Sequence, residues 1–274
     1  MKFLPGKKSW VLGVVAGLAL CGIQAAASDL EDIRERGVLR VALPLEDAPP
    51  FVVTGADGRV GGFEGQLLTD LARRMDIRLE VVRLSGGRDE VIAEVLAGRA
   101  DLALGQLADS LERAKSVRFS TPYLTLNQMQ IFDRLAATRA GGIAALLARD
   151  DTRLAAWADS PALPFLREEW DAARLVVLPT MLEALSEAEA GRVAGLAGDD
   201  VEIGRWMNKH PEAAVQWRVQ LRRDRPITLA MAMHWKAEDL QAWVNLYLEK
   251  CRHDETLDKL RALHFGEAPV RADR

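Results

Sequence analysis

The sequence has 274 residues and a small acidic excess, with 40 Asp and Glu residues against 36 Lys and Arg residues, so its net charge is −4. An acidic chain is repelled by the phosphates of nucleic acids and by anionic membrane surfaces, so we expect neither as its partner. Hydrophobic residues make up 49% of the chain, and its length is sufficient for two lobes. The composition therefore predicts a globular protein.

The amino terminus has the composition of an export signal. Three lysines within the first eight residues precede an apolar run from Trp10 to Leu20, and three alanines follow at residues 25–27. A membrane span needs about 20 apolar residues, and this run is shorter. We therefore expect residues 1–27 to be a signal peptide that is cleaved after Ala27, so the mature protein is exported and has 33 basic and 40 acidic residues.

Of the two cysteines, Cys21 lies in this predicted signal peptide and Cys251 lies in a helical pattern near the end of the chain. Leu20 precedes Cys21 where a lipoprotein signal has a small residue, so we do not expect lipidation. The mature chain then has no internal disulfide, and Cys251 is expected to be a packed thiol. The four histidines lack the spacing of metal ligands, so we expect neither a metal nor a cofactor.

Short apolar runs alternate with helical periodicity in the first half of the chain, which is the pattern of a parallel sheet flanked by helices. A turn is expected at Asp57 and Gly58. These elements together predict an α/β lobe. The expected strands are residues 38–43, 79–82 and 100–104, and the expected helices carry apolar faces over residues 67–75 and 91–96.

A short helix is expected to follow the strand at residues 100–104. Asp109 stands three residues before Glu112, which is the spacing of a helix N-cap and its reciprocal acid, so the helix should begin near Ser110. Arg113 then lies in its first turns, where free N–H groups and a guanidinium can together bind a carboxylate. The alternative is that Arg113 is an ordinary solvated helix residue.

The second half begins with a strand, residues 126–133, that is expected to leave the first lobe. Residues 136–151 are rich in alanine and carry no clear pattern. A further strand is expected over residues 227–235. The other expected strands are residues 154–157, 175–178 and 193–197, with helices starting near Pro161 and Pro179 and a final pair at residues 238–251 and 255–264.

Five short sequence words resemble the family 3 periplasmic solute-binding proteins, which are the polar amino-acid receptors of ABC importers. The resemblance implies an α/β, two-lobed periplasmic binding protein of type II (Venus flytrap), whose parallel-sheet lobes are joined by two crossover strands. It implies a lobe 1 of residues 28–125 and 226–274 and a lobe 2 of residues 126–225. The words are APPF at residues 48–51, GGFE at 61–64, GRAD at 98–101, LERAKSVRFS at 111–120 and FSTPY at 119–123.

The resemblance also implies a ligand site between the lobes. Arg113 would bind a carboxylate from lobe 1, and Asp199, in the word AGRVAGLAGDD, would accept a hydrogen bond from an ammonium group. The alternative for Asp199 or Asp200 is that it caps the following helix, while the other points into the cleft. The remaining implied contacts are an apolar wall from Phe51, a hydroxyl from Ser160, and the positions of Gln106 and Ala108.

Several positions depart from the family pattern. Gln106 and Ala108 stand where hydroxyl residues usually precede the arginine. Ala48 stands where an aromatic side chain often faces the ligand, and Asp159 replaces a glycine. We therefore expect common polar amino acids to bind weakly, and we expect a carboxylate ligand that uses the amide of Gln106 or the space beside Ala48.

The resemblance implies a monomeric receptor, not an enzyme, that passes an amino acid or a related carboxylate to an ABC permease in the inner membrane. Two other classes stay open. Periplasmic cyclohexadienyl dehydratases resemble the same scaffold and carry an acid at the position of Asp199. The third class is an accessory or sensory binding subunit of another periplasmic system, because a shared fold does not fix function.

The mature protein is expected to begin at Ser28, because the basic start, the short apolar run and the small residues before Ser28 stand in the order of a cleaved signal. The intact mass of protein recovered from the periplasm measures this. A chain that keeps Met1, or one that carries a diacylglycerol on Cys21, would contradict the prediction.

Overall fold

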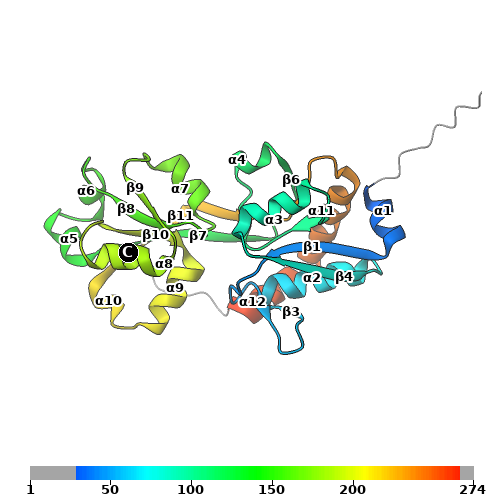
Figure 1. The fold of residues 1–274 in the computed structure, drawn as a ribbon. Coiled ribbons are helices and arrows are strands. Elements are labelled where there is room, and N and C mark those ends of the chain that lie inside the picture. The colour runs from blue at the N-terminus through cyan, green and yellow to red at the C-terminus, as the bar shows by residue number, and fades with distance from the viewer. Residues whose placement is uncertain (1–28, 266–274) are drawn as a thin grey trace, which may run out of the picture.

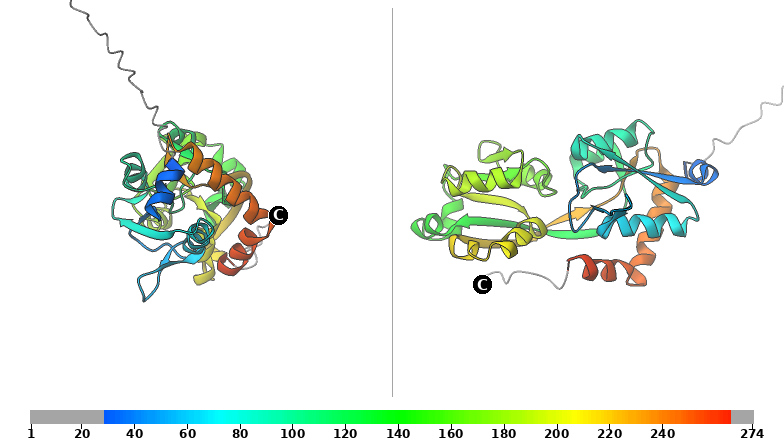
Figure 2. Two further views of the ribbon diagram at one scale, coloured as in Figure 1. Left: turned by 90° about the vertical axis from the view of Figure 1, so that its right-hand side faces the viewer. Right: turned by 60° about the horizontal axis from the view of Figure 1, so that its bottom comes forward.

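The computed structural model describes residues 29–265, which form two α/β lobes (Figure 1). Two long strands connect the lobes, and the last helices lie on lobe 1 (Figure 2). The predicted signal peptide and its cleavage site lie outside the described residues. Between residues 29 and 265, no helix combines the length and the apolar character needed to cross a membrane.

Lobe 1 is built on a five-stranded sheet. Its strands are β1 (Val38–Pro44), β4 (Arg78–Leu84), β5 (Leu102–Ala103), β6 (Val117–Phe119) and β12 (Ala232–His234), in the order β4-β1-β5-β12-β6. β1 is parallel to β4 and β5, whereas β12 is antiparallel to β5 and β6. The helices of this lobe are α1 (Asp29–Arg36), α2 (Gly62–Arg74), α3 (Gly87–Leu96), α4 (Leu111–Ala114), α11 (Glu238–His253) and α12 (Thr256–Phe265).

The central strand β1 is buried on both faces. Leu39, Val41 and Leu43 belong to the large core that also contains the apolar face of α2. Ala42 points to the other face, where it belongs to a second cluster with Val91 of α3. A parallel strand covered by helices on both sides has a nearly continuous apolar sequence, which is why the first predicted strand is confirmed. The hairpin of β2 (Val53–Thr54) and β3 (Val60–Gly61) encloses the predicted turn.

Lobe 2 is built on a second five-stranded sheet, in the order β11-β7-β10-β8-β9. Residues 136–151, which carry no clear pattern in the sequence, contain the end of one short helix and the whole of a second. The strands are β7 (Leu124–Asp133), β8 (Leu154–Trp157), β9 (Leu175–Leu178), β10 (Gly195–Asp199) and β11 (Trp217–Leu229). The helices are α5 (Arg134–Arg139), α6 (Ile143–Leu147), α7 (Leu163–Glu169), α8 (Met181–Glu189), α9 (Asp200–Lys209) and α10 (Ala213–Gln216).

The strands β7 and β11 connect the lobes. They pair antiparallel along their length, with a register shift between Arg222 and Pro226. Proline has no N–H to give to a strand ladder and is tolerated at such irregularities. The single return strand predicted over residues 227–235 is divided in the structure, because β11 starts within the sheet of lobe 2, ends at Leu229, and is followed by the separate strand β12.

Helix α4 starts where the sequence predicts but has a different cap. The hydroxyl of Ser110 accepts the N-terminal hydrogen bond, from the backbone N–H of Arg113 at 3.4 Å. The carboxylate of Asp109 instead accepts a hydrogen bond from the hydroxyl of Thr228 on β11. The predicted reciprocal pair of Asp109 and Glu112 is therefore wrong, because a contact to the crossover strand takes this carboxylate.

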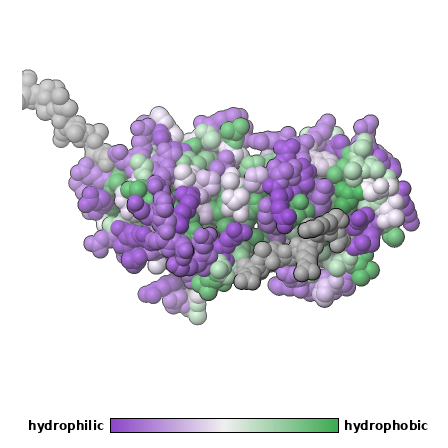
Figure 3. Space-filling model, turned by 180° about the vertical axis from the view of Figure 1, so that it is seen from behind, coloured by the Kyte–Doolittle hydropathy of each residue, from purple (hydrophilic) through white to green (hydrophobic). Residues whose placement is uncertain are grey.

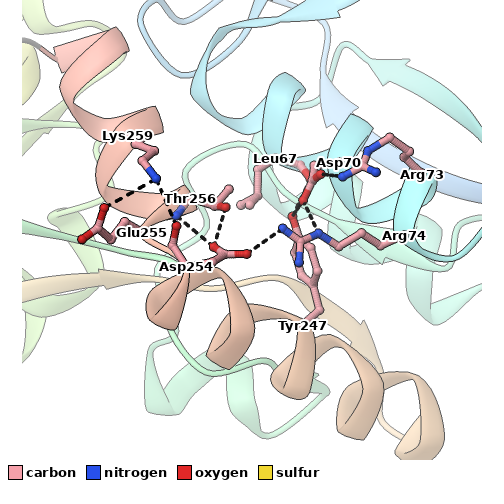
Figure 4. A network of polar contacts seen from close by, with 9 residues as sticks. All are labelled: Leu67, Asp70, Arg73, Arg74, Tyr247, Asp254, Glu255, Thr256 and Lys259. Carbon is pink, nitrogen blue, oxygen red and sulfur yellow. Dashed lines mark hydrogen bonds and ion pairs between the residues drawn. The ribbon is translucent and has the colours of Figure 1, made fainter.

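A polar network attaches the last two helices to α2 (Figure 4). Arg74 pairs with Asp70 on α2, at 2.8 Å from Nε to Oδ2, and with Asp254 after α11, at 3.0 Å from Nη2 to Oδ2. Tyr247 donates its hydroxyl to the carbonyl of Leu67 at 3.1 Å. These contacts join segments 180 residues apart, so the two sequence portions of lobe 1 form one packed unit.

Charged and polar residues dominate the back surface over lobe 1, while apolar residues gather towards the far end of lobe 2 (Figure 3). Single exposed apolar residues are normal on globular proteins. The outer surface therefore does not mark a ligand site, and the cavities between the lobes are the candidates.

The buried carboxylate of Glu64 fixes the loop after β5. It accepts hydrogen bonds from the backbone N–H of Gly105 at 3.0 Å, from the N–H of Gln106 at 2.8 Å, and from the hydroxyl of Tyr123. Burial raises the pKa of Glu64, whereas the three donors favour its ionised form. Gln106 has a φ of 59°, which is costly for a residue with a side chain, so the loop needs such support.

Glu64→Ala is expected to lower the free energy of unfolding by about 3 kcal/mol or more, because three donors lose their acceptor and each buried unsatisfied group costs about 1 to 3 kcal/mol. Urea unfolding followed by circular dichroism measures the loss. Glu80→Ala, on the exposed side of β4, is the matched control and should change stability by less than about 0.5 kcal/mol. A loss below about 1 kcal/mol in Glu64→Ala would contradict this role.

Candidate functional site

Two cavities between the lobes share Arg88 and Asp159 in their walls. The first has a volume of about 320 Å³, and Trp157 and Glu202 of lobe 2 contribute to its wall; we call it the Trp157 cavity. The second has a volume of about 710 Å³ and is lined in part by Arg113; we call it the Arg113 cavity. Residues from both lobes line each cavity, so both are sites that a relative movement of the lobes would open or close.

The six predicted site residues occupy three different places. Phe51 and Gln106 line the Trp157 cavity, Arg113 and Ser160 line the Arg113 cavity, and Ala108 and Asp199 line neither. The structure therefore does not bring Arg113 and Asp199 to one cavity.

Arg88 bridges the two lobes. It lies in the first turn of α3, and its side chain is only 11% exposed. Its Nε donates to the carbonyl of Gln106 in lobe 1 at 3.2 Å, and its Nη1 donates to the carbonyl of Asp159 in lobe 2. The same Nη1 lies 3.5 Å from Oδ1 of Asp159. Burial lowers the pKa of Arg88, and the negative charge of Asp159 opposes that effect.

Glycine allows this close approach of the lobes at the start of α3. Gly87 has a φ of 76°, a conformation that strains other residues. A Cβ at Gly87 would also lie 3.3 Å from Oδ1 of Asp159. The sequence Gly86-Gly87-Arg88 therefore places a guanidinium directly behind a backbone that can approach lobe 2.

Asp199 ends β10 and caps α9. Its Oδ1 accepts hydrogen bonds from the N–H of Val201 at 3.0 Å and of Glu202 at 2.9 Å. Its Oδ2 is buried and has no hydrogen-bond partner among residues 29–265. Burial raises the pKa of Asp199 to about 6. The alternative in which one of Asp199 and Asp200 caps the helix is confirmed for Asp199, and Asp200 accepts hydrogen bonds from Asn127 on β7.

Glu202 is a second, partly buried carboxyl group, in the first turn of α9. Its Oε2 accepts a hydrogen bond from Nε1 of Trp157 at 3.2 Å. Burial, with a further contribution from the charge of Asp199, raises the pKa of Glu202 to about 7. Trp157 can lie here because Gly198 has no side chain: a Cβ at Gly198 would be 1.9 Å from Cη2 of the indole. A carboxyl group that keeps its proton near neutral pH can donate a hydrogen bond or a proton to a ligand.

Arg113 is held by weak contacts that leave most of its binding capacity available. Its Nη1 lies 3.4 Å from the carbonyl of Ala108, and its Nη2 lies 3.4 Å from Oδ1 of Asp89, whose side chain is 91% exposed. Such an exposed ion pair contributes little energy. Ala108 itself is fully buried and offers the site only its backbone carbonyl.

The cavity walls include Trp157, Glu202 and Arg88, which were not predicted as site residues. Trp157 is only 2% exposed and belongs to the core of lobe 2, yet it also lines a cavity. Glu202 stands three residues after Asp199, at the N3 position, which indicates a cap and not a ligand contact. The glycine pair before Arg88 was the available signal for that residue, because it marks a close backbone approach.

The chemistry of this region is that of recognition by charge. Guanidinium groups bind carboxylates, and the carboxyl groups of Asp199 and Glu202 bind cationic groups or hold protons. Within the part of the chain that the structure describes, no group of three or more His, Cys, Asp and Glu side chains is arranged to hold a metal ion.

Comparison with known proteins gives a consistent result. The model of the bacterial extracellular solute-binding proteins, family 3, matches residues 39–267. The cyclohexadienyl dehydratase of Pseudomonas aeruginosa is 27% identical over 209 residues, which are 73% of this chain and 74% of that protein. The L-cystine-binding protein TcyJ of Escherichia coli is 32% identical over 117 residues, which are 41% of this chain and 43% of that protein.

The solved structures show the same fold. An ancestral cationic amino acid solute-binding protein, AncCDT-1, superposes with a TM-score of 0.63 at 25% sequence identity, over 87% of this chain and all of that one. The two-lobed architecture predicted from the sequence is thereby confirmed. The relatives include binding proteins and an enzyme, so the similarity alone does not decide between these classes.

Glu202→Gln is expected to flatten the pH dependence of stability. The pKa of Glu202 in the folded protein, about 7, lies above its ordinary value of 4.5, so the folded state binds this proton more tightly than the unfolded chain. This contribution is fully present below pH 4.5 and is lost as the pH rises to about 7. The difference between 4.5 and about 7, at about 1.36 kcal/mol per pH unit, corresponds to about 3 kcal/mol.

Urea unfolding at about pH 4.5 and pH 7.5 measures this effect in the wild type and in Glu202→Gln. Glu249→Gln makes the same chemical change at an exposed position of α11 and should keep the wild-type pH dependence. An unaltered pH dependence in Glu202→Gln would show that this carboxyl group titrates like an ordinary surface glutamate.

Proposed function

This chain belongs to the bacterial extracellular solute-binding proteins, family 3, and from that membership we propose that it is the receptor of an ABC importer. In this proposal it binds an amino acid or a related carboxylate between its lobes and presents the closed form to a permease in the inner membrane. It acts as a monomer in the periplasm, after removal of the signal peptide.

The observation that carries the proposal is the unpartnered Oδ2 of Asp199. A buried carboxylate oxygen without a donor costs free energy, and a ligand that brings an ammonium group removes that cost. The first oxygen of Asp199 already caps α9, so the side chain is held in one orientation. Binding of a cationic group here would also lower the pKa of Asp199 from its raised value of about 6.

Arg113 supplies the opposite charge in this proposal. Its weak contacts to Ala108 and Asp89 can be exchanged for a two-pronged pair with the carboxylate of the ligand, and Ser160 lines the same cavity with a hydroxyl group. Closure of the lobes brings the two binding groups to the ligand. A ligand favours the closed form by the difference between its affinities for the two forms.

Phe51 and Gln106 complete the proposed site on the side of the Trp157 cavity. Phe51 gives an apolar wall, fixed by its edge-to-face contact with Phe265 at 5.1 Å between ring centroids. Gln106 gives an amide in place of the hydroxyl groups usual in the family. Ala108 adds no polar side chain, so ordinary polar amino acids should lose a contact at this position.

Glu202 favours a second candidate function, that of an enzyme acting on a cyclohexadienyl acid. The observation behind it is a partly buried carboxyl group, with a pKa of about 7, in the wall of a cavity. Such a group can protonate a leaving hydroxyl group near neutral pH. Incubation of the purified protein with prephenate separates the candidates: the appearance of an aromatic product supports the enzyme, and binding without product supports the receptor.

Arg113→Ala is expected to reduce ligand affinity by at least about thirtyfold, since removing one partner of a charge pair costs about 2 to 5 kcal/mol. Thermal-shift screening of the twenty amino acids and related acids identifies the ligand, and calorimetry then measures the affinity. Arg149→Ala removes an equivalent charge from an exposed pair with Asp151 and is the control. Unchanged affinity in Arg113→Ala would make this arginine an ordinary helix residue.

A further inference from the structure

Arg88 is a buried cation between the lobes to which the proposed receptor function gives no task. Its Nε and Nη1 donate to the carbonyls of Gln106 and Asp159. Its Nη2 takes part in none of the hydrogen bonds formed among residues 29–265, and Arg88 lines both cavities. Nε and Nη1 therefore hold the protein backbone, and Nη2 is available to a ligand.

Acidic groups surround this guanidinium. Glu64 and Asp159 both interact with its charge, and so does Glu202. The charge of Arg88 in turn lowers the pKa of Asp199, against the larger opposite effect of burial. Arg88 thus serves as the counter-ion of an acidic cleft. A cationic ligand group placed in this cleft would face a positive charge that is already buried there.

The charge partner that Arg88 has in lobe 2 is easily replaced. The side chain of Asp159 is 66% exposed, and its Oδ1 is 3.5 Å from Nη1, which is too far for a strong pair. A ligand carboxylate that reaches Arg88 can accept a charge-assisted hydrogen bond from Nη2, which is stronger than the contact with Asp159. The exposed carboxylate of Asp159 can then turn into solvent at little cost.

Arg88 and Arg113 line one common cavity of about 710 Å³. The positive charge of Arg113 is one of the influences that lower the pKa of Arg88, so the two guanidiniums interact electrostatically. Two cations that face one cavity repel each other, and two carboxylates of one ligand would relieve that repulsion. The pair therefore suits a ligand with an acidic group at each end.

We propose that Arg88 is a specificity residue that binds a second acidic group, so that the ligand is a dicarboxylic amino acid or a dicarboxylic acid. This inference rests on the proposed receptor function and narrows its ligand class. Arg113 binds one carboxylate, Arg88 binds the other, and an amino group, where present, pairs with Asp199. The chain would then differ in specificity from the ancestral cationic amino acid solute-binding protein to which its structure is similar.

The test is calorimetry of the mature protein with matched ligands. The diacids are L-glutamate, L-2-aminoadipate and glutarate, L-glutamine is the neutral isostere of the first, and L-lysine is the cationic probe. The wild type should bind its best diacid at least about tenfold more tightly than L-glutamine or L-lysine, because a charged hydrogen bond is lost in the other two.

Two variants give opposite results if the inference is correct. Arg88→Leu keeps the apolar part of the side chain but removes its positive charge. This variant should therefore lose the preference for diacids and gain affinity for L-lysine. Asp159→Ala removes the competing carboxylate and should bind the diacid severalfold more tightly, with no change for L-glutamine. Arg99→Leu is the control and should behave like the wild type, because Arg99 is exposed, lies just after α3 and pairs with Glu94.

Comparable wild-type affinities for the diacid and for L-glutamine or L-lysine would overturn the inference, and so would a retained diacid preference in Arg88→Leu. Either result leaves amino-acid binding, and hence the proposed function, in place. If none of the five probes and none of the twenty amino acids binds, the receptor function itself fails, and this inference fails with it. Should Arg88→Leu not fold, the wild-type preference and the Asp159→Ala result decide the question.

Discussion

The hydrogen bonds that converge on Glu64 are the contact on which the arrangement of the site depends. This buried carboxylate, on α2, holds Gly105 and Gln106 of the loop after β5 and the hydroxyl of Tyr123 just before β7. It therefore joins three parts: the core helix, the site loop and the start of the crossover. The carbonyl of Gln106, fixed in this way, is the acceptor that holds Arg88. A shift of this loop would displace the only lobe 1 carbonyl to which Arg88 donates among the described residues.

The same contact explains why short sequence words can identify this fold. The word GGFE contains Glu64, and the word FSTPY contains its partner Tyr123, 59 residues later. Gly62 in the first word has a φ of 80°, and a Cβ there would be 2.5 Å from the carbonyl oxygen of Phe51. These residue types are required by contacts, so their order predicts the lobe 1 core. The alanine-rich segment at residues 136–151 could not be placed, because its helices α5 and α6 have only six and five residues and no clear apolar face.

The candidate site was less predictable than the fold, for a physical reason. Arg113 and Asp199 stand in local patterns, a helix start and a strand end, that the sequence shows directly. Arg88 also stands at a helix start, and there an arginine is normally solvated. Its burial comes from the approach of lobe 2 at Asp159, a contact between segments 71 residues apart that no local periodicity encodes. Asp199 was predicted both as a cap and as a ligand group, and its two oxygens allow both roles at once.

The pairing of Arg88 with Asp159 has a consequence for how the lobes close. A buried guanidinium needs a counter-charge, because an unpaired buried charge is costly. Asp159 provides one, but its carboxylate is 66% exposed, and exposed pairs contribute only about 0 to 1 kcal/mol. In the diacid proposal, a ligand carboxylate that replaces this exposed side chain at the buried guanidinium gains more than it displaces. The exposed acid at residue 159 therefore pairs with Arg88 too weakly to exclude a ligand carboxylate.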